Sequence, residues 1–326
     1  MIKLTVRREV WPIRGSFTIS RGSKTEAVVV VVELTERPHR GRGECVPYAR
    51  YGETVEGVIA AIEALSDRIE AGIDRHTLLE IMPAGAARNA VDCALWDLEA
   101  KRSGKPAWTR TGFDQPKATI TAYTLSLDTA EKMGAAAAEN AHRPLLKLKL
   151  AGTGDLDRVA AVRAGAPKSE LIVDANEGWT ADHYRDFAPK LGALGVVMIE
   201  QPLPANNDGG LMGLERPVPV CADEACHDAA TLDKLVGKYD LINIKLDKTG
   251  GLTEALRLKA AAEAKGLGIM VGCMIGTSLG MAPGMLLAQG ARYVDLDAPL
   301  LLDRDRQPGL RYEGSTVYPP LPALWG

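Results

Sequence analysis

Three acidic residues each follow a short apolar run: Asp174, Glu200 and Asp223 lie 26 and 23 residues apart. If the runs are neighbouring strands, the three carboxylates meet at one edge and repel each other unless a cation lies among them. Carboxylate oxygens are the ligands that Mg²⁺ prefers, and Mn²⁺ accepts the same set. The alternative is that each acid caps the helix that follows it. Because all three recur in register, the sequence predicts a site for one divalent metal ion.

Lysines flank these acids. Lys147 and Lys149 end one apolar run two residues apart, so their side chains project to the same side, and Lys245 ends a run four strands further along. A metal ion can stabilise the ene-diolate that forms when a carboxylate substrate loses its α-proton. Repulsion between lysines and the nearby metal charge would lower a lysine pKa toward neutral pH, as a base requires. Lysines on opposite faces let the proton leave from one side and return from the other, so the pattern predicts racemisation or epimerisation.

Eight apolar runs recur every 22 to 27 residues, with helix-like sequence between them. They cover residues 119–125, 145–150, 171–175, 196–200, 218–223, 241–246, 268–273 and 293–297. Repeated strand–helix units of this length predict a parallel sheet closed into a barrel, with seven helices between the strands. In such a barrel the catalytic groups lie at the carboxyl ends of the strands. We therefore expect an α/β fold, a modified (β/α)7β TIM barrel over residues 114–304.

The first 113 residues do not follow this rhythm. They contain a valine-rich strand at 27–34, amphipathic helices at 54–71 and 86–102, and polar loops at 20–25 and 47–52. The tail, 305–326, carries Gly, Pro and short β-like pieces. We predict an N-terminal α+β capping domain that the tail completes.

Composition excludes several classes of protein. Lys and Arg number 39 against 42 Asp and Glu, a net charge of −3, which argues against a nucleic-acid partner. Five scattered cysteines do not form a disulfide framework, and the N-terminus lacks the apolar core of a signal peptide. The uncharged stretch 266–291 is interrupted by Gly and Pro and predicts a strand, a loop and a buried helix instead of a membrane span. We expect a cytoplasmic homo-oligomer.

Several motifs carry a resemblance to a known family. VDANEGW, MIEQPLP, CADE and NIKLDKTGG, behind LKLKL, resemble the muconate-lactonising subgroup of the enolase superfamily, as do GECVPYARYGE and PAGAARNAVDCALWDLEAK near the N-terminus. The resemblance implies metal ligands at Asp174, Glu200 and Asp223, and acid/base lysines at Lys149 and Lys245. It also implies that Lys147 polarises the substrate carboxylate and helps to lower the pKa of Lys149.

Asp295 and Asp297 end the eighth run and share one side. This pair is similar to the feature with which dipeptide epimerases receive the α-ammonium of the substrate, and a buried ammonium needs such anionic acceptors. The alternative is a pair that caps a loop. The same resemblance sends the terminal carboxylate of the dipeptide to the metal. It places further residues along the pocket: Thr124, Cys273, Met274 and Ile275.

The loop SRGSKTEA offers two basic residues, Arg21 and Lys24, to an acidic second residue of a dipeptide. Arg21 is the first choice because its planar fork matches a carboxylate. This resembles L-Ala-D/L-Glu epimerases, whose family role is the salvage of murein peptides. Gly276 leaves room for a different dipeptide. An o-succinylbenzoate synthase or muconate cycloisomerase of the same subgroup, and a non-catalytic ligand-binding barrel, are the other readings.

Two further groups carry less weight. Cys221, Cys226 and His227 have poor spacing for zinc. Asp247 and Lys248 are expected to form ion pairs in a loop beside Lys245.

Overall fold

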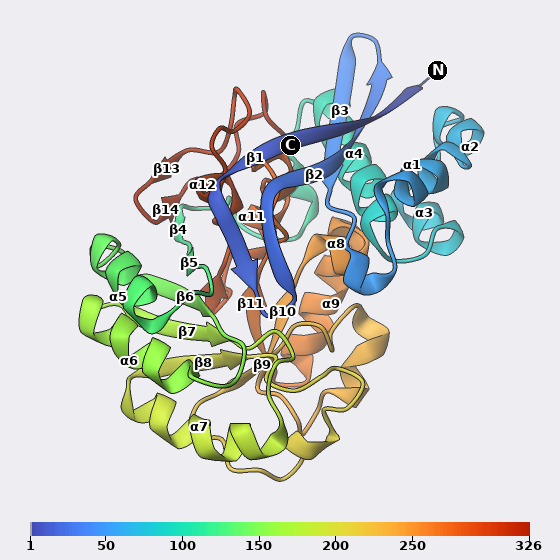
Figure 1. Ribbon diagram of the computed structural model, residues 1–326. Coiled ribbons are helices and arrows are strands. Elements are labelled where there is room, and N and C mark those ends of the chain that lie inside the picture. The colour runs from blue at the N-terminus through green and yellow to red at the C-terminus, as the bar shows by residue number, and fades with distance from the viewer. Residues whose placement is uncertain (1) are drawn as a thin grey trace.

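An antiparallel three-stranded sheet and four helices form the N-terminal part of the computed structural model, which describes residues 2–326 (Figure 1). The strands are β1 (Lys3–Ile19), β2 (Gly22–Glu36) and β3 (His39–Cys45), in the order β1-β2-β3. The helices are α1 (Val55–Glu63), α2 (Ser66–Glu70), α3 (Arg75–Ile81) and α4 (Ala86–Ser103). The single helix expected over 54–71 is therefore two helices. The N-terminal α+β capping domain is confirmed.

Two glycines of β3 bring α4 unusually close to the sheet. A Cβ at Gly41 would lie 2.3 Å from the carbonyl oxygen of Ala94, and one at Gly43 would lie 2.1 Å from that of Ala90. No side chain fits at these separations, so the glycines of HRGRGEC let the helix backbone rest on the strand. This contact fixes the position of Glu44, the next residue of β3.

Eight parallel strands form the second part, in the order β12-β11-β10-β9-β8-β7-β6-β5. Their bounds are β5 (Tyr123–Leu125), β6 (Leu145–Lys149), β7 (Glu170–Asp174), β8 (Val196–Glu200), β9 (Val220–Ala222), β10 (Leu241–Ile244), β11 (Gly268–Val271) and β12 (Tyr293–Val294). A hydrogen bond of 2.8 Å from Ala122 N to Val294 O joins the first segment to the last. The predicted strand order of a barrel is thus confirmed.

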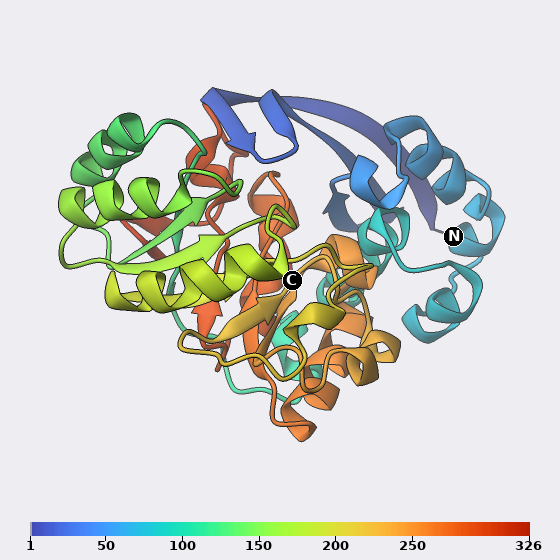
Figure 2. The same ribbon diagram turned by 60° about the horizontal axis from the view of Figure 1, so that its bottom comes forward.

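The helices around this sheet do not follow every strand. They are α5 (Ala130–Glu139), α6 (Asp155–Gly165), α7 (Ala181–Ala193), α8 (Leu246–Thr249), α9 (Leu252–Ala264), α10 (Ser278–Met281), α11 (Gly284–Leu287) and α12 (Ala298–Leu301). Figure 2 shows α5, α6 and α7, in green, side by side on one flank of the strands. After β8 and β9 only 3-10 turns occur, at Gly209–Leu211 and Ala229–Lys234. In the first connection Pro202, Pro204 and several glycines oppose an α-helix. The prediction of seven helices was wrong at these two places.

The tail contacts both parts of the chain. β13 (Tyr312–Glu313) and β14 (Thr316–Val317) form a small sheet with β4 (Thr119–Ile120), so the run predicted at 119–125 is divided between two sheets. The last residues reach α4, where Gly326 N donates to Asp97 Oδ1 at 2.7 Å and Trp325 Nε1 donates to Cys93 O at 2.9 Å. These bonds support the prediction that the tail returns to the capping domain.

A buried carboxylate fastens three distant segments together. Glu44, 1% exposed, accepts hydrogen bonds from Thr277 N at 2.7 Å, from Thr277 Oγ1, and from Arg306 Nη2 at 2.7 Å. Arg306 also binds Glu9 at 2.6 Å. The cap, the segment after β11 and the tail therefore share one ion-pair network.

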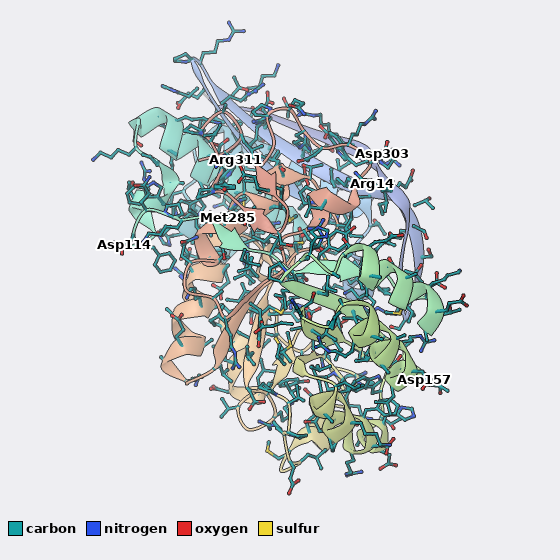
Figure 3. The ribbon with its side chains drawn as sticks, turned by 90° about the vertical axis from the view of Figure 1, so that its left-hand side faces the viewer. Arg14, Asp114, Asp157, Met285, Asp303 and Arg311 are labelled. Carbon is teal, nitrogen blue, oxygen red and sulfur yellow. The ribbon has the colours of Figure 1, made fainter. Side chains whose placement is uncertain are left out.

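The uncharged stretch 266–291 folds as β11, α10 and α11, close to the prediction. In Figure 3, Met285 of α11 lies inside the molecule, where it is 0% exposed, and Asp157 of α6 lies on the outside. Across residues 2–326, none of the helices combines the length and apolar character that crossing a membrane requires.

Candidate active site

The three predicted acids converge at the carboxyl ends of their strands. Asp174 and Glu200 are register partners at the ends of β7 and β8, and Asp223 directly follows β9. One carboxylate oxygen from each lies within 4.8 Å of the others, and all three residues are buried. Parallel strands bring these ends together because each acid occupies the same position relative to its strand.

Each carboxylate has one oxygen held by a neighbouring group and one that faces a lysine. The holding donors are Asn176 N on Asp174 Oδ1 (2.9 Å), Asn243 Nδ2 on Glu200 Oε1 (2.7 Å) and Lys248 Nζ on Asp223 Oδ1 (2.6 Å). The facing lysines are Lys149 Nζ at Asp174 Oδ2 (2.7 Å), Lys147 Nζ at Glu200 Oε2 (2.6 Å) and Lys245 Nζ at Asp223 Oδ2 (2.6 Å). The second set of oxygens therefore lines the interior of the site.

Lys149 and Lys245 approach the acids from opposite sides. Lys149 ends β6 and Lys245 directly follows β10. In the sheet order three strands separate β6 from β10 in either direction around the barrel, counting across the bond that joins β5 to β12. The structure thus gives the opposed placement that a two-base proton transfer requires.

Lys147 has a different environment from Lys149, although both lie on β6. Its Nζ lies 2.7 Å from Asp295 Oδ2, 2.6 Å from Glu200 Oε2 and 3.4 Å from Asp174 Oδ2, and its side chain is 1% exposed. Three carboxylates therefore surround this ammonium, which ties the end of β6 to the segment after β12.

The pKa values of these groups follow from burial and from this charge pattern. Burial raises the pKa of Asp174, but Lys149 and Lys147 outweigh it and lower the pKa to about 2. Burial and the charge of Asp174 raise the pKa of Glu200. Burial lowers the pKa of Lys245, but Asp223 and Glu200 outweigh it and raise the pKa well above its usual value. The protein groups alone therefore do not lower the pKa of this lysine as a base requires. Around Lys245 the carboxylates Asp223, Glu200 and Asp174 outnumber the one neighbouring ammonium, that of Lys147.

The acid trio fits a hard divalent cation. All three donors are carboxylate oxygens, the set that Mg²⁺ prefers. Glu200 Oε2 is buried and accepts no hydrogen bond, although the Lys147 ammonium is near. Because a carboxylate oxygen has two lone pairs, this one can still bind a metal ion beside Lys147.

Asp295 and Asp297, 4% and 3% exposed, lie after β12 beside the same cluster. Asp295 Oδ2 is paired with Lys147, and its buried Oδ1 accepts no hydrogen bond. Asp297 Oδ2 accepts from Thr124 N at 2.6 Å. Burial and the charge of Asp295 raise the pKa of Asp297 to about 7. The structure thus brings the pair and Thr124 together.

The segment after β11 supplies the other predicted pocket residues. Cys273 and Ile275 are half-buried and Met274 is 9% exposed. Burial, with the charges of Asp295 and Asp297, raises the pKa of the Cys273 thiol well above its usual value. Ile275 packs against a cluster that includes Ile13 of β1, so this segment faces the capping domain.

Arg21 lies at the tip of the β1–β2 hairpin, whose lower end in Figure 1 reaches the barrel strands. The expected loop at 20–25 is only a two-residue turn, and Lys24 is on β2. The Arg21 guanidinium makes four bonds through its two Nη atoms: to Asn176 O (2.8 Å), Glu177 Oε2 (3.3 Å), Tyr48 OH (3.1 Å) and Glu224 Oε1 (2.7 Å). Lys24 is exposed, with its Nζ 5.7 Å from the centre of the Tyr48 ring. Arg21 is thus committed to the protein, whereas Lys24 is available.

Three residues after the acids adopt left-handed backbone conformations that sequence reasoning missed. They are Asn176 (φ 44°), Glu177 (φ 67°) and Gln201 (φ 33°). Non-glycine residues rarely adopt this region, and such strain gathers at functional sites. Gln201 Oε1 accepts from Asp223 N at 2.9 Å and so joins the ends of β8 and β9. The motifs DANEGW and EQPLP carry the only signal for these turns.

The expected loop ion pair of Asp247 and Lys248 is wrong. Both residues lie in α8 and are buried. Lys248 binds Asp223, and Asp247 Oδ1 accepts from Val46 N and Asn89 Nδ2, both at 2.9 Å. The helical turn sends the two side chains to different partners, so they do not pair.

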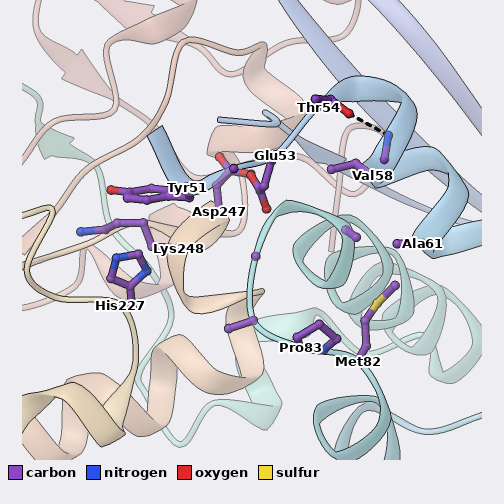
Figure 4. Close-up of a pocket in the computed structure, with 15 residues that line it drawn as sticks. Tyr51, Glu53, Thr54, Val58, Ala61, Met82, Pro83, His227, Asp247 and Lys248 are labelled. Carbon is purple, nitrogen blue, oxygen red and sulfur yellow. Dashed lines mark hydrogen bonds between the residues drawn. The ribbon is translucent and has the colours of Figure 1, made fainter. Parts of the chain in front are cut away.

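A cavity of about 500 Å³ lies beside this helix, between the cap and the barrel (Figure 4). His227, Asp247 and Lys248 line it from the barrel, and Tyr51, Glu53 and Met82 line it from the cap. Burial raises the pKa of Asp247 to about 7. The cavity is thus adjacent to α8, and Lys245 is the N-cap residue of that helix.

Comparisons with known proteins agree with this geometry. Residues 1–112 match the model of the mandelate racemase / muconate lactonizing enzyme N-terminal domain, and residues 128–320 match the enolase C-terminal domain-like model. The chain is 45% identical over 314 residues to the L-Ala-D/L-Glu epimerase of Escherichia coli (96% of this chain, 98% of that protein). It is 44% identical over 303 residues to the N-acetyl-D-glutamate racemase of a Pseudoalteromonas species (91% and 95%).

A solved structure is also similar along the whole chain. It is an enolase family member from Agrobacterium tumefaciens with homology to dipeptide epimerases, bound to sodium and L-Ala-L-Glu. The two are 54% identical with a TM-score of 0.99, and each chain is covered completely. With both family models matched and relatives of this identity, the chain belongs to the mandelate racemase / muconate lactonizing enzyme family of the enolase superfamily.

Proposed function

We propose that this protein is a magnesium-dependent dipeptide epimerase that acts on L-Ala-D/L-Glu by proton transfer between two lysines. The observation that carries the proposal is the placement of Lys149 and Lys245 on opposite sides of the three converging acids. The Escherichia coli relative carries the same activity in its name. In the cell the activity would serve the recovery of murein peptides.

The residues of the chain divide the reaction between them. Asp174, Glu200 and Asp223 hold the metal ion, which supplies positive charge for the negative charge that develops on the substrate carboxylate. Lys149 removes or returns the α-proton of the C-terminal residue on one face, and Lys245 does the same on the other.

Lys147, inside the cluster, adds positive charge where the substrate carboxylate binds. Burial of all these groups excludes water and strengthens their interactions.

Asp295 and Asp297 receive the α-ammonium of the N-terminal residue. Asp295 Oδ1 is buried without a donor, so it is an acceptor that the protein itself leaves unfilled. Thr124 N keeps Asp297 in place. An N-acetylated amino acid, the substrate named for the Pseudoalteromonas relative, brings no ammonium to this position. The same argument disfavours the substrates of o-succinylbenzoate synthase and muconate cycloisomerase.

Lys24 is the residue that we assign to the side-chain carboxylate of the substrate. All four Nη contacts of Arg21 are with protein groups, so a substrate carboxylate would have to displace Glu224 or Asn176 O to form a bidentate pair. Lys24 lies on the adjacent strand, exposed and beside Tyr48. We therefore replace the first choice made from the sequence, Arg21, by Lys24, with Arg21 holding the hairpin over the barrel.

The test is hydrogen exchange at the substrate. In D₂O with Mg²⁺, L-Ala-L-Glu should lose its Glu α-hydrogen signal and yield L-Ala-D-Glu, as followed by NMR. N-acetyl-D-glutamate, o-succinylbenzoate precursors and dipeptides with neutral second residues serve as parallel substrates. Absence of exchange with every dipeptide would overturn the proposal, and faster racemisation of N-acetylglutamate would favour the second relative. The homo-oligomer, the cytoplasmic location and the domain boundaries stay predictions.

A further inference from the structure

Lys248 is buried beneath Asp223 and has no free hydrogen-bond donor. Its side chain is 0% exposed, and its Nζ donates to Asp223 Oδ1 (2.6 Å), to Asp223 O and to Asn243 O (3.0 Å). An ammonium has three N–H groups, and each one here has an acceptor. Within the described chain, Lys149 Nζ and Lys245 Nζ each donate to one carboxylate only. All hydrogen bonds of Lys248 are therefore with protein groups, and no N–H group is left to bind a substrate.

Asn243 of β10 supports a second acid in the same way. Its Nδ2 donates to Glu200 Oε1 at 2.7 Å, and its backbone carbonyl accepts from Lys248. Asn243 is 0% exposed. One residue of β10 thus connects the groups that hold Glu200 and Asp223.

We propose that Lys248 and Asn243 are positioning residues that restrict Asp223 and Glu200 to one metal-coordinating oxygen each, Oδ2 and Oε2. This rests on the metal site of the proposed function. Lys248 donates all three N–H groups to protein acceptors and so holds Asp223 Oδ1 in place, whereas Lys245, which binds Oδ2, has N–H groups left over and can turn away when a cation binds there. Asp174 has the same arrangement, since Asn176 N holds its Oδ1.

The restriction determines how much of the cation stays open. Mg²⁺ and Mn²⁺ bind about six oxygen ligands in octahedral geometry. Three acids that give one oxygen each leave about three positions for substrate and water, whereas a chelating acid removes one of them. Lys248 thereby maintains the open positions that a substrate carboxylate needs.

The experiment counts exchangeable waters on bound Mn²⁺ by water-proton and ¹⁷O relaxation, with the full-length protein and Mn²⁺ alone as the probe. The wild type should hold about three inner-sphere waters, and Lys248→Met about one fewer, because Asp223 then binds through both oxygens. Its kcat/KM for L-Ala-L-Glu should fall about 10- to 100-fold. Lys259→Met, which removes a buried lysine paired with Glu263 on α9, is the matched control and should keep the wild-type water count.

Other outcomes overturn the inference in distinguishable ways. An unchanged water count in Lys248→Met would show that Lys248 does not limit coordination, and a higher count would show that Asp223 is lost as a ligand. If Lys248→Met does not fold by circular dichroism, Asn243→Leu applies the same test to Glu200 and should also lose about one water. A wild type that binds no Mn²⁺ would overturn the metal site, and the proposed function with it.

Discussion

Removal of either opposed lysine should separate hydrogen exchange from epimerisation. Lys245 Nζ makes one hydrogen bond, to Asp223 Oδ2 at 2.6 Å, so Lys245→Met removes the base with little change to the packing of its apolar stem. Lys149, across the barrel, keeps its bond to Asp174. General acid–base groups contribute about 10²- to 10⁴-fold, so interconversion should slow by that factor, equivalent to about 3–5 kcal/mol in the barrier.

The assay follows the Glu α-hydrogen by ¹H NMR in D₂O, from L-Ala-L-Glu and from L-Ala-D-Glu in separate samples. Each variant retains one base, so each should exchange the α-hydrogen of one epimer only. Lys149→Met and Lys245→Met should show opposite preferences, because the two lysines lie on opposite sides of the acids.

Two results would refute this reasoning. If both variants exchange the same epimer, the lysines act on the same face of the substrate. If Lys245→Met interconverts the epimers at the wild-type rate, Lys245 is not a base. Lys259→Met, which removes the partner of Glu263 on α9, is again the control and should behave as the wild type.

Lys24→Met should raise KM for L-Ala-L-Glu while KM for a dipeptide with a neutral second residue stays unchanged; steady-state kinetics on both substrates measure this, and equal effects on both would contradict the assignment. Glu44→Ala should lower the free energy of unfolding by about 1–3 kcal/mol in chemical denaturation, because the buried Thr277 N loses its acceptor while Arg306 keeps Glu9 as its remaining ion-pair partner, whereas Asp182→Ala, at an exposed ion pair, should change it little. Burial raises the pKa of Asp247 from 3.8 to about 7, so the folded state keeps a proton that the unfolded chain releases, and stability falls as pH rises from about 4 to about 7. Asp247→Asn should therefore stabilise the protein more at pH 8 than at pH 5, and an equal effect at both would exclude this titration.

The acids and the opposed lysines could be predicted from the sequence because strand ends of a parallel barrel meet at one edge. The convergence of Asp174, Glu200 and Asp223 follows from their positions after apolar runs. The opposed placement of Lys149 and Lys245 follows from those positions and from the number of strands between them. These placements depend on regular geometry, which a repeat of strands and helices specifies.

The supporting groups could not be predicted in this way. Lys248 reaches Asp223 because the single turn of α8 folds it back beneath β9, and the sequence alone shows only an acid and a lysine side by side. Arg21 meets Asn176 and Glu224, more than 150 residues away, through the length and direction of a hairpin. Contacts of this kind depend on where loops end in space, for which neither periodicity nor residue type is a signal.

The ion-pair cluster has a consequence for how ligands associate with the protein. Its four ammonium groups and four carboxylates balance formally: Lys147, Lys149, Lys245 and Lys248 against Asp174, Glu200, Asp223 and Asp295. When a divalent cation binds to this neutral cluster, the cluster acquires a net charge of +2. An anion that binds next reduces this positive charge. Thermodynamic linkage then requires each partner to tighten the association of the other by an equal factor. Saturation with one should therefore lower the dissociation constant of the other, and high ionic strength should weaken the reciprocity less than at an exposed site.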